Sequence, residues 1–292
     1  MTPQTTIVPV YAGDAMQLIN ISHAYNTGPL VLRNISLAIP NIQGDGQVIG
    51  WFGRSGRGKT TLAMICAGLM EASEGEVLAG SPLRRVIAGE VGMVWQESLL
   101  MDHDTVLGNL TFAGMRRGKV TKKDASDRAI EMLERFNLVE HKDKYPDEIS
   151  GGQRRRVAIL QQVLCTAQQG SFVLVLDEPF TGLDEVSKRH VCELIVECSK
   201  LDEFATIWLI SHDVPETLAV SDHAVLLGWE YDANNEPIEG ATILQTYDVS
   251  AEGLIWRDRN ILERPEFSRL CRRVISDIEK DDPVRRKLGL VT

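Results

Sequence analysis

The sequence predicts an α/β fold in which helices cover the faces of a mostly parallel β-sheet. Apolar runs of strand length alternate with longer segments of helical periodicity, and such alternation is typical of parallel sheets. The two clearest strands, 48–52 and 172–176, are continuous apolar runs, as expected of strands buried on both faces. Glycine follows the first strand and two acids follow the second, at the strand end where open α/β sheets bind ligands.

The first third of the chain is expected to be mainly β-structure. After a loose leader at 1–14, apolar residues alternate in short sets between 16 and 39, and alternation predicts strands. The buried strand at 48–52 is followed by a helix over 60–70, and another strand is expected at 87–95.

Residues from about 97 to 165 have a different pattern, which predicts an inserted helical subdomain. The tetrapeptide 121–124 resembles a helix capping box. Behind it, Ala129, Leu133 and Phe136 recur at helical spacing, so one face of this helix is expected to be buried.

The second half of the chain returns to the alternating pattern. Strands are expected at 172–176, 205–210 and 224–227. A helix over 186–201 separates the first two strands, and an extension over 229–292 begins where the pattern loosens after Gly228. Within this extension, 234–237 predicts a turn and 265–279 predicts an amphipathic helix.

Composition and charge restrict the class of protein. The chain of 292 residues is 43% hydrophobic and 25% charged, which is ordinary for a globular protein, and no apolar run approaches the roughly 20 residues of a membrane-spanning helix. Five scattered cysteines without a CxxC pair argue for a reducing compartment and against a zinc site or a disulfide scaffold. A net charge of -10 argues against nucleic acid as the main partner. No Lys or Arg precedes Arg33, unlike in a secretory signal. We therefore expect a cytoplasmic protein that reaches a membrane only through a partner.

The segment 53–60 matches the phosphate-binding pattern G-x-x-x-x-G-K-[ST], with a strand before it and a helix after it as the pattern requires. Its glycines let successive backbone N–H groups turn toward phosphate oxygens. Lys59 would neutralise the β- and γ-phosphates, Thr60 would ligate Mg²⁺, and the start of the helix would add the positive end of its dipole. The predicted nucleotide-binding residues here are Gly53, Ser55, Gly56, Gly58, Lys59, Thr60 and Thr61. A chance match in a glycine-rich turn is the alternative, which the flanking elements disfavour.

Two carboxylates end the apolar strand 172–176. Asp177 is expected to hold Mg²⁺ through water, and Glu178 to act as the general base that polarises the attacking water. A solvated strand end is the alternative interpretation, and the phosphate-binding pattern upstream favours the catalytic one.

A second anion-binding device precedes these acids. Ser150, Gly151, Gly152 and Gln153 open a helix, and a helix N-terminus attracts anions. This tetrapeptide resembles the signature motif of the ABC ATPase family, and the other motifs of that family follow in order. They are Gln96 at the Q-loop, 181–184 at the D-loop, Ser211-His212-Asp213 at the switch histidine, and Tyr25 at the adenine-stacking position.

The resemblance covers roughly residues 15–228 and implies a P-loop NTPase core with a mostly parallel sheet, an antiparallel β subdomain and an inserted α-helical subdomain. It also implies ATP and Mg²⁺ as cofactors and a head-to-tail pair of ATPase domains, expected to be a homodimer. Residues 150–153 would then bind the γ-phosphate of the partner's ATP. His212 would contact this phosphate within its own chain, Gln96 would sense Mg²⁺ and the water, and Asp184 would connect the two sites.

Several of these assignments have plainer alternatives. Tyr25 could be a packing aromatic, and His212 could be structural. The run Arg154-Arg155-Arg156 is interpreted as a solvated or interface face rather than a nucleic-acid site, and 99–101 is either core or the groove that receives a membrane subunit. Ile149 replaces the usual leucine of the signature, a near-isosteric change, and the D-loop reads Thr-Gly-Leu-Asp where Ser-Ala-Leu-Asp is commoner. No catalytic group is missing, so a competent site is predicted.

The function favoured by the resemblance is the ATP-hydrolysing motor of an importer for a small solute. Tyr145-Pro146 before the signature is frequent in bacterial importers, and 177–180 together with the tail resembles the nitrate, sulfonate and taurine importer branch. The partners implied are integral membrane permease subunits and, through them, a solute-binding protein. The chain would lie peripherally on the cytoplasmic face of the inner membrane.

Three alternatives to the importer remain in view. An exporter or lipid-transport motor would share the same ATPase domain. A soluble ABC protein of translation or DNA repair is disfavoured by the single ATPase domain, the scattered cysteines and the acidic charge. A small-molecule kinase outside the family is disfavoured by 150–153. The extension at 229–292 is expected to stabilise the pair, bind a regulatory ligand or cover the core.

Overall fold

The computed structural model describes residues 16–39, 46–79, 83–96, 100–116, 120–166, 173–202, 205–252, 254 and 261–282. The expected leader at 1–14 lies outside these residues. None of the described helices is long and apolar enough to cross a membrane.

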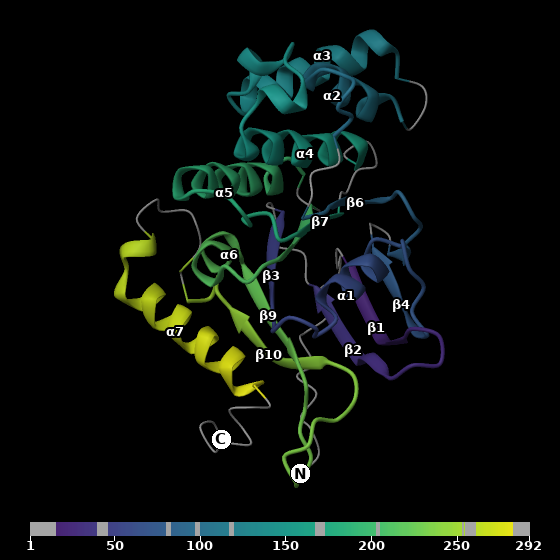
Figure 1. Ribbon diagram of the computed structural model, residues 1–292, viewed down its shortest axis with the longest axis vertical. Coiled ribbons are helices and arrows are strands. Elements are labelled where there is room, and N and C mark those ends of the chain that lie inside the picture. Colours follow the sequence, from purple (N-terminus) through teal and green to yellow (C-terminus); the bar gives the residue numbers. More distant parts are fainter. Residues whose placement is uncertain are drawn as a thin grey trace.

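A six-stranded sheet with the order β10-β9-β3-β8-β7-β6 forms the centre of the molecule (Figure 1). Its strands are β3 (Gln47–Phe52), β6 (Val91–Val94), β7 (Val173–Asp177), β8 (Thr206–Ile210), β9 (His223–Gly228) and β10 (Thr242–Asp248). All neighbours pair in parallel except β9 and β10, which are antiparallel. The predicted α/β fold with a mostly parallel sheet is confirmed.

A second, four-stranded sheet with the order β2-β1-β4-β5 lies beside the first. It contains β1 (Met16–Ala24), β2 (Leu30–Ile39), β4 (Glu74–Ala79) and β5 (Arg84–Arg85), all paired antiparallel. Helix α1 (Lys59–Cys66) joins the two sheets, because its Leu62 and Ile65 share one buried cluster with Leu18 of β1 and Trp51 of β3. This cluster fixes the start of α1, and with it the predicted phosphate-binding loop at 53–60.

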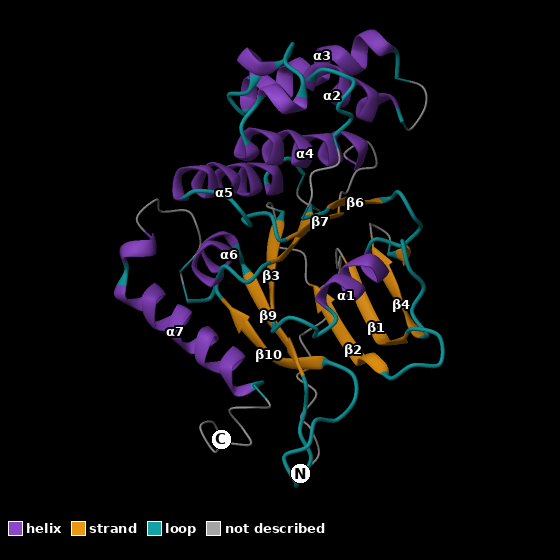
Figure 2. Cartoon of the chain, viewed as in Figure 1, coloured by secondary structure: helices purple, strands orange, loops and turns teal. Residues whose placement is uncertain are grey.

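Helices α2 to α5 gather at one end of the main sheet (Figure 2). They are α2 (Val106–Met115), α3 (Lys122–Arg135), the short 3-10 helices η1 (Val139–His141) and η2 (Pro146–Glu148), α4 (Gly151–Thr166) and α5 (Glu185–Ser199). Helix α6 (Val214–Val220) lies farther along the sheet, where it contacts α5, α7 and β3. As predicted, Thr121 caps α3, since its hydroxyl accepts a hydrogen bond from Asp124 N. Ala129 and Leu133 are fully buried on the face expected from their spacing.

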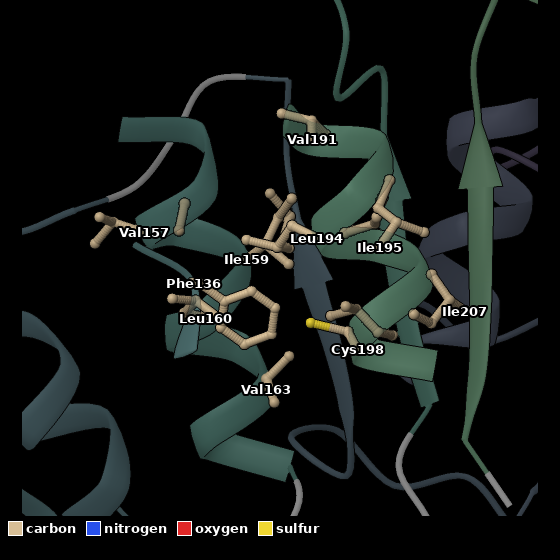
Figure 3. Close-up of a cluster of buried hydrophobic side chains, with 14 of the residues drawn as sticks. Phe136, Val157, Ile159, Leu160, Val163, Val191, Leu194, Ile195, Cys198 and Ile207 are labelled. Carbon is tan, nitrogen blue, oxygen red and sulfur yellow. The ribbon is translucent and has the colours of Figure 1, made fainter. Parts of the chain in front are cut away.

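The close packing of α4 against α5 is drawn in Figure 3. Ile159, Leu160 and Val163 of α4 meet Leu194 and Cys198 of α5, and all five side chains are buried. Burying a large aliphatic side chain contributes about 1.5–3 kcal/mol, so this seam holds the N-terminus of α4 in a fixed place relative to the sheet.

The extension predicted from residue 229 packs on the main sheet. It contributes β10, the 3-10 helix η4 (Ile261–Glu263) and α7 (Pro265–Lys280). Phe267, Leu270 and Val274 of α7 are buried in one cluster with Phe52 of β3 and Leu226 of β9. The predicted apolar stripe of this helix therefore covers the β9 side of the sheet (Figure 1).

Two predicted boundaries are wrong. The helix expected over 60–70 ends at Cys66, because Gly68 adopts φ 68° and a left-handed residue terminates a helix. The strand expected over 87–95 begins only at Val91, because Glu90 N bonds to Ile87 O in a turn.

Candidate nucleotide-binding site

A cavity of about 710 Å³ opens where the loops after β3, β7 and β8 meet. Its lining comes from segments far apart in sequence: Val31, Gly53, Arg54, Ser55, Gly56, Gly58, Lys59, Thr60, Thr61, Gln96, Asp177, Glu178, Ser211, His212 and Ile278. The structure thus brings together the predicted phosphate-binding loop, both predicted carboxylates, Gln96 and His212.

The glycines of the phosphate-binding loop are required by its shape. Gly56 and Gly58 have φ 78° and 74°, in the left-handed region that glycine tolerates best. A Cβ on Gly53 would lie 2.4 Å from Leu227 O, and one on Gly58 would lie 2.7 Å from Leu32 Cδ2. Gly58 is also the N-cap of α1 and supplies no side-chain cap. The first amides of α1 are therefore available to an anion.

Lys59 spans the phosphate-binding loop. Its Nζ donates to Gly53 O at 2.7 Å and to Arg54 O at 3.1 Å. Burial lowers the pKa of the Lys59 ammonium, while the nearby carboxylates of Glu178 and Asp177 act in the opposite direction. The phosphates of a nucleotide would be stronger acceptors for this amine than two neutral carbonyls.

Thr60 and Asp177 meet at the floor of the cavity, where Thr60 Oγ1 donates to Asp177 Oδ2 at 3.0 Å. Burial raises the pKa of the Asp177 carboxyl, and the hydrogen bond from Thr60 opposes this shift. A hydroxyl and a carboxylate side by side are hard oxygen donors of the kind that Mg²⁺ prefers. These two residues therefore fit the predicted metal site.

Glu178 and His212 form a pair across the ends of β7 and β8. His212 Nδ1 lies 2.7 Å from Glu178 Oε2, and His212 N donates to the same oxygen at 3.3 Å. Glu178 has φ 51°, a left-handed conformation that is uncommon for glutamate, and its N–H is bonded to Ile210 O at 2.8 Å. The backbone bond of Glu178 to Ile210 and the contact of its side chain with His212 together fix the orientation of this carboxylate.

Gln96 lies just after β6 and is held by the helix that follows the predicted signature. The guanidinium of Arg155 donates to Trp95 O at 2.7 Å and also to Gln96 O. Arg155 is 5% exposed, so the interpretation of 154–156 as a solvated or interface face is wrong at this position. Arg155 lies on the inner face of α4, three residues after the buried Gly152, and this helical spacing was the signal that could have identified it.

The predicted signature segment does not line the cavity of its own chain. Ser150 and Gly151 are exposed at the start of α4. Ser150 Oγ accepts from Gln153 N at 3.2 Å, and Gln153 Oε1 accepts from Ser150 N at 2.9 Å, a reciprocal capping box. Gly152 is buried against α5, where an added Cβ would lie 2.7 Å from Ser187 Oγ.

Asp184 and Tyr25 also lie outside the lining. Asp184 caps α5, accepting from Ser187 N at 2.9 Å and Ser187 Oγ at 3.0 Å, and these hydrogen bonds lower the pKa of its carboxyl. Tyr25 is 45% exposed, and its hydroxyl lies 3.0 Å from Thr61 Oγ1. The position of Tyr25 beside α1 is compatible with either an adenine-stacking or a packing role.

Known proteins resemble the chain over most of its length. The family described as "ABC transporter" matches residues 32–181. The aliphatic sulfonates import ATP-binding protein SsuB 2 of Agrobacterium fabrum is 33% identical, over 74% of this chain and 76% of that protein. The phosphonates import ATP-binding protein PhnC of Chromohalobacter salexigens is 35% identical, over 68% and 76%. The sulfate/thiosulfate import ATP-binding protein CysA of Salmonella typhi is 34% identical, and the match spans about half of that relative, 53%.

Two solved structures share the fold. The structure of cbiO1 from Clostridium perfringens, part of the ABC transporter complex cbiONQ, superposes with a TM-score of 0.67 at 22% identity, over 83% of this chain and 91% of that one. The dimeric post-hydrolysis structure of the ATP-binding cassette MJ0796 with ADP and Pi gives 0.63 at 21% identity, over 80% and 98%.

Proposed function

The chain belongs to the ABC transporter family and is an ATP-hydrolysing member of it, and from this premise we propose that it is the motor subunit of a membrane importer. Two copies would close head to tail around ATP and drive separate membrane subunits. The observation that carries this proposal is the divided site. The phosphate-binding loop, Glu178 and His212 share one cavity, whereas Ser150 and Gly151 are exposed outside it.

ATP would bind with its phosphates in the curve of the loop. Lys59 would exchange the carbonyls of Gly53 and Arg54 for the β- and γ-phosphate oxygens. Thr60 and Asp177 would hold Mg²⁺, which neutralises phosphate charge when bound. Tyr25 would stack on adenine, since it stands next to Thr61 at the start of α1.

Hydrolysis would be a direct attack of water on the γ-phosphate. Glu178 would accept a proton as the water oxygen bonds to phosphorus, and the bond from the γ-phosphorus to the bridging oxygen would break to release ADP. His212 would keep the Glu178 carboxylate aimed through its 2.7 Å contact. Gln96, whose backbone is held by Arg155, would orient the water.

The second grip on ATP would come from the partner copy. The exposed start of α4 offers backbone amides and the Ser150 hydroxyl to the γ-phosphate. The capping box presets these groups, so little ordering is needed when the two copies meet. Asp184, exposed at the start of α5, would connect the two sites.

Import of a small solute is the transport reaction that we propose. Curated relatives at 33–35% identity are named for the import of sulfonates, phosphonates and sulfate, and an importer subunit of this kind acts at the cytoplasmic face of the inner membrane. Its partners would be integral membrane permease subunits and, through these, a solute-binding protein.

The test uses a variant that binds ATP but hydrolyses it slowly. Glu178→Gln removes the proton acceptor, so with ATP and Mg²⁺ it is expected to sediment as a dimer, and with ADP as a monomer. Adding Ser150→Arg should return it to a monomer by blocking the partner's phosphate, while binding of a fluorescent ATP analogue persists.

The matched control adds Ser268→Arg, the same change at an exposed position of α7. It should leave the Glu178→Gln dimer intact. If Glu178→Gln stays monomeric at high protein concentration, or if Ser150→Arg dimerises as well as Ser268→Arg, the proposed head-to-tail pair is wrong.

A further inference from the structure

One side chain of the phosphate-binding loop points away from the cavity, into the C-terminal extension. Arg57, between the two left-handed glycines, is 6% exposed and is not part of the cavity lining. Its guanidinium carbon lies 3.7 Å from the ring centroid of Trp229, the first residue of the extension. A buried cation within the loop therefore depends on residues outside the predicted ATPase domain.

The partner of Arg57 is Asp281, directly after α7. Arg57 Nε donates to Asp281 Oδ2 at 2.6 Å, and Arg57 Nη2 donates to Asp281 O at 2.9 Å. Trp229 N donates to Asp281 Oδ1 at 3.1 Å, and Tyr231 Oη donates to Asp281 O at 3.3 Å. Asp281 is 1% exposed, so it ties the end of α7, the start of the extension and the loop together at one buried point.

Neighbouring contacts extend this connection. Arg54 Nη1, also in the loop, lies 2.8 Å from Asp282 Oδ2. Ile278, two residues before the end of α7, lines the cavity itself. A Cβ on Gly228 would lie 2.9 Å from Asp281 Cγ, so the chain passes too close for any side chain there. The end of α7 thus contacts the loop at two arginines and reaches the site that the loop encloses.

A buried ion pair of this kind determines geometry more than it adds stability. Desolvation offsets much of the attraction, but removing one partner leaves an uncompensated buried charge, which is strongly unfavourable. A loop that must aim several amides at one phosphate group needs its backbone held to within about 0.5 Å. Gly56 and Gly58 give the loop little rigidity of its own. The ion pair of Arg57 with Asp281 therefore holds the loop backbone in place.

We propose that Asp281 is a positioning residue for the nucleotide, which holds the phosphate-binding loop in its anion-binding curve through Arg57. Docking of α7 and nucleotide binding then stabilise each other, since coupling between two sites is reciprocal. The inference rests on nucleotide binding by this loop, which is part of the proposed function, and is independent of dimerisation and transport.

The experiment measures ADP affinity by titration calorimetry on the full chain with Mg²⁺. Asp281→Asn is expected to weaken ADP binding by roughly tenfold, within the usual range of coupling between sites. The direction of the change in ADP affinity is informative. Asp281 and the phosphates are both negative, so removing the Asp281 charge would by electrostatics alone tighten ADP binding. Asp277→Asn is the matched control: the same change one helical turn earlier, at a residue bonded to Tyr247 at 2.9 Å, should stay within twofold of wild type.

Arg57→Lys tests the same contact from the loop side and keeps the charge. A lysine cannot make the forked contact with Oδ2 and the backbone O of Asp281, so Arg57→Lys should weaken ADP binding about as much as Asp281→Asn. The effects of these two changes should be non-additive. The effects of Arg57→Lys and Asp277→Asn on ADP affinity should be additive. Hydrogen exchange gives a second measure, in which ADP should slow the amides of α7 in wild type but not in Asp281→Asn or Arg57→Lys.

The outcomes separate the two proposals. Failure of wild type to bind ADP would overturn the proposed function together with this inference. If wild type binds ADP and Asp281→Asn behaves as Asp277→Asn does, only the inference is overturned. Should Asp281→Asn not fold, Arg57→Lys decides, and an unchanged ADP affinity in that variant would overturn the inference.

Discussion

The proposed catalytic carboxylate, Glu178, depends on its immediate contacts. Glu178 has a left-handed backbone, which is held by the bond from its N–H to Ile210 O, and its side chain is held by His212. Left-handed backbone at a non-glycine residue costs free energy and is typical of functional sites. The arrangement places strain where the proposed chemistry needs a fixed proton acceptor.

His212→Ala tests this arrangement. Loss of the 2.7 Å contact leaves only the longer bond from the backbone N–H of residue 212, at 3.3 Å, to hold the Glu178 carboxylate. The kcat for ATP hydrolysis is therefore expected to fall by roughly 10²–10³-fold, the scale of a general-base contribution. ADP affinity should stay within about threefold of wild type. Steady-state ATPase assays and ADP titration measure the two quantities, and a variant with unchanged kcat would contradict the role of His212.

Single residues were predictable where parallel strands set their position. Asp177 ends β7 and His212 follows β8. The ends of parallel strands meet at one edge, so both carboxylates and His212 were predictable as parts of one site, although their direct contact was not predicted. Arg57 and Asp281 were not predicted as partners, because 224 residues separate them and no local pattern encodes the pairing. Arg155 was misread for a similar reason, since its acceptors on Trp95 and Gln96 are about 60 residues upstream.

At the scale of elements, caps and periodicity predicted most helices and strands. Thr121 marks the start of α3, and the Ser150–Gln153 capping box marks the start of α4. The ends of elements were less predictable. The apolar pattern runs on past Cys66, but α1 ends there and a left-handed turn follows at Gly68. At this turn the chain packs closely against a distant segment, since a Cβ on Gly68 would lie 2.9 Å from Ala88 N.

The contact between β10 and α7 predicts that the free energy of unfolding depends on pH in the alkaline range. Tyr247 Oη donates to Asp277 Oδ2 at 2.9 Å, and burial raises the pKa of this phenol well above its usual value of 10.0. Above pH 10 the unfolded chain therefore loses this proton while the folded chain keeps it, so the folded state binds more protons and the free energy of unfolding falls as pH rises.

Tyr247→Phe removes this ionisation. Urea unfolding between pH 8 and 11 should give a steeper loss of stability above pH 10 in wild type than in Tyr247→Phe, while at pH 8 the variant should be less stable by about 1 kcal/mol for the lost hydrogen bond. Parallel pH profiles of the two proteins would show that Tyr247 does not couple β10 to α7 in this way.

At the scale of the whole molecule, two large buried clusters lie on opposite faces of the main sheet. One joins α4 and α5 to β7 and β8 (Figure 3), and the other joins α1 and the antiparallel sheet to β3. The cavity lies where loops from both clusters converge. Alternating strands and helices predicted the main sheet, but its strand order depends on pairings between distant segments, which single-sequence periodicity does not encode.

The rates at which the five cysteines react with a thiol reagent should report how often the folded structure opens. Cys66, Cys192 and Cys198 are buried and burial raises the pKa of each thiol, while burial raises the pKa of Cys271 to about 11. Thiolate is the reactive form. At pH 7.5 these four thiols are therefore expected to react slowly with a thiol reagent in native protein, and Cys165, which is only partly buried, should react first.

Labelling of Cys66 should then report how strongly a nucleotide stabilises the fold. Cys66 ends α1, the helix that begins in the phosphate-binding loop, and is 0% exposed, so it reacts only when this region opens. A ligand present at 100 times its Kd stabilises the folded state by about 2.7 kcal/mol, so ADP at that excess should slow Cys66 labelling by up to about 100-fold.

Mass spectrometry of peptides after timed labelling measures the rate, and Cys165 in the same sample is the internal control, since it is accessible without global opening. Equal slowing of both cysteines would indicate a change in the reagent rather than in the protein, and a Cys66 rate unaffected by saturating ADP would mean that the loop and α1 do not form the nucleotide site.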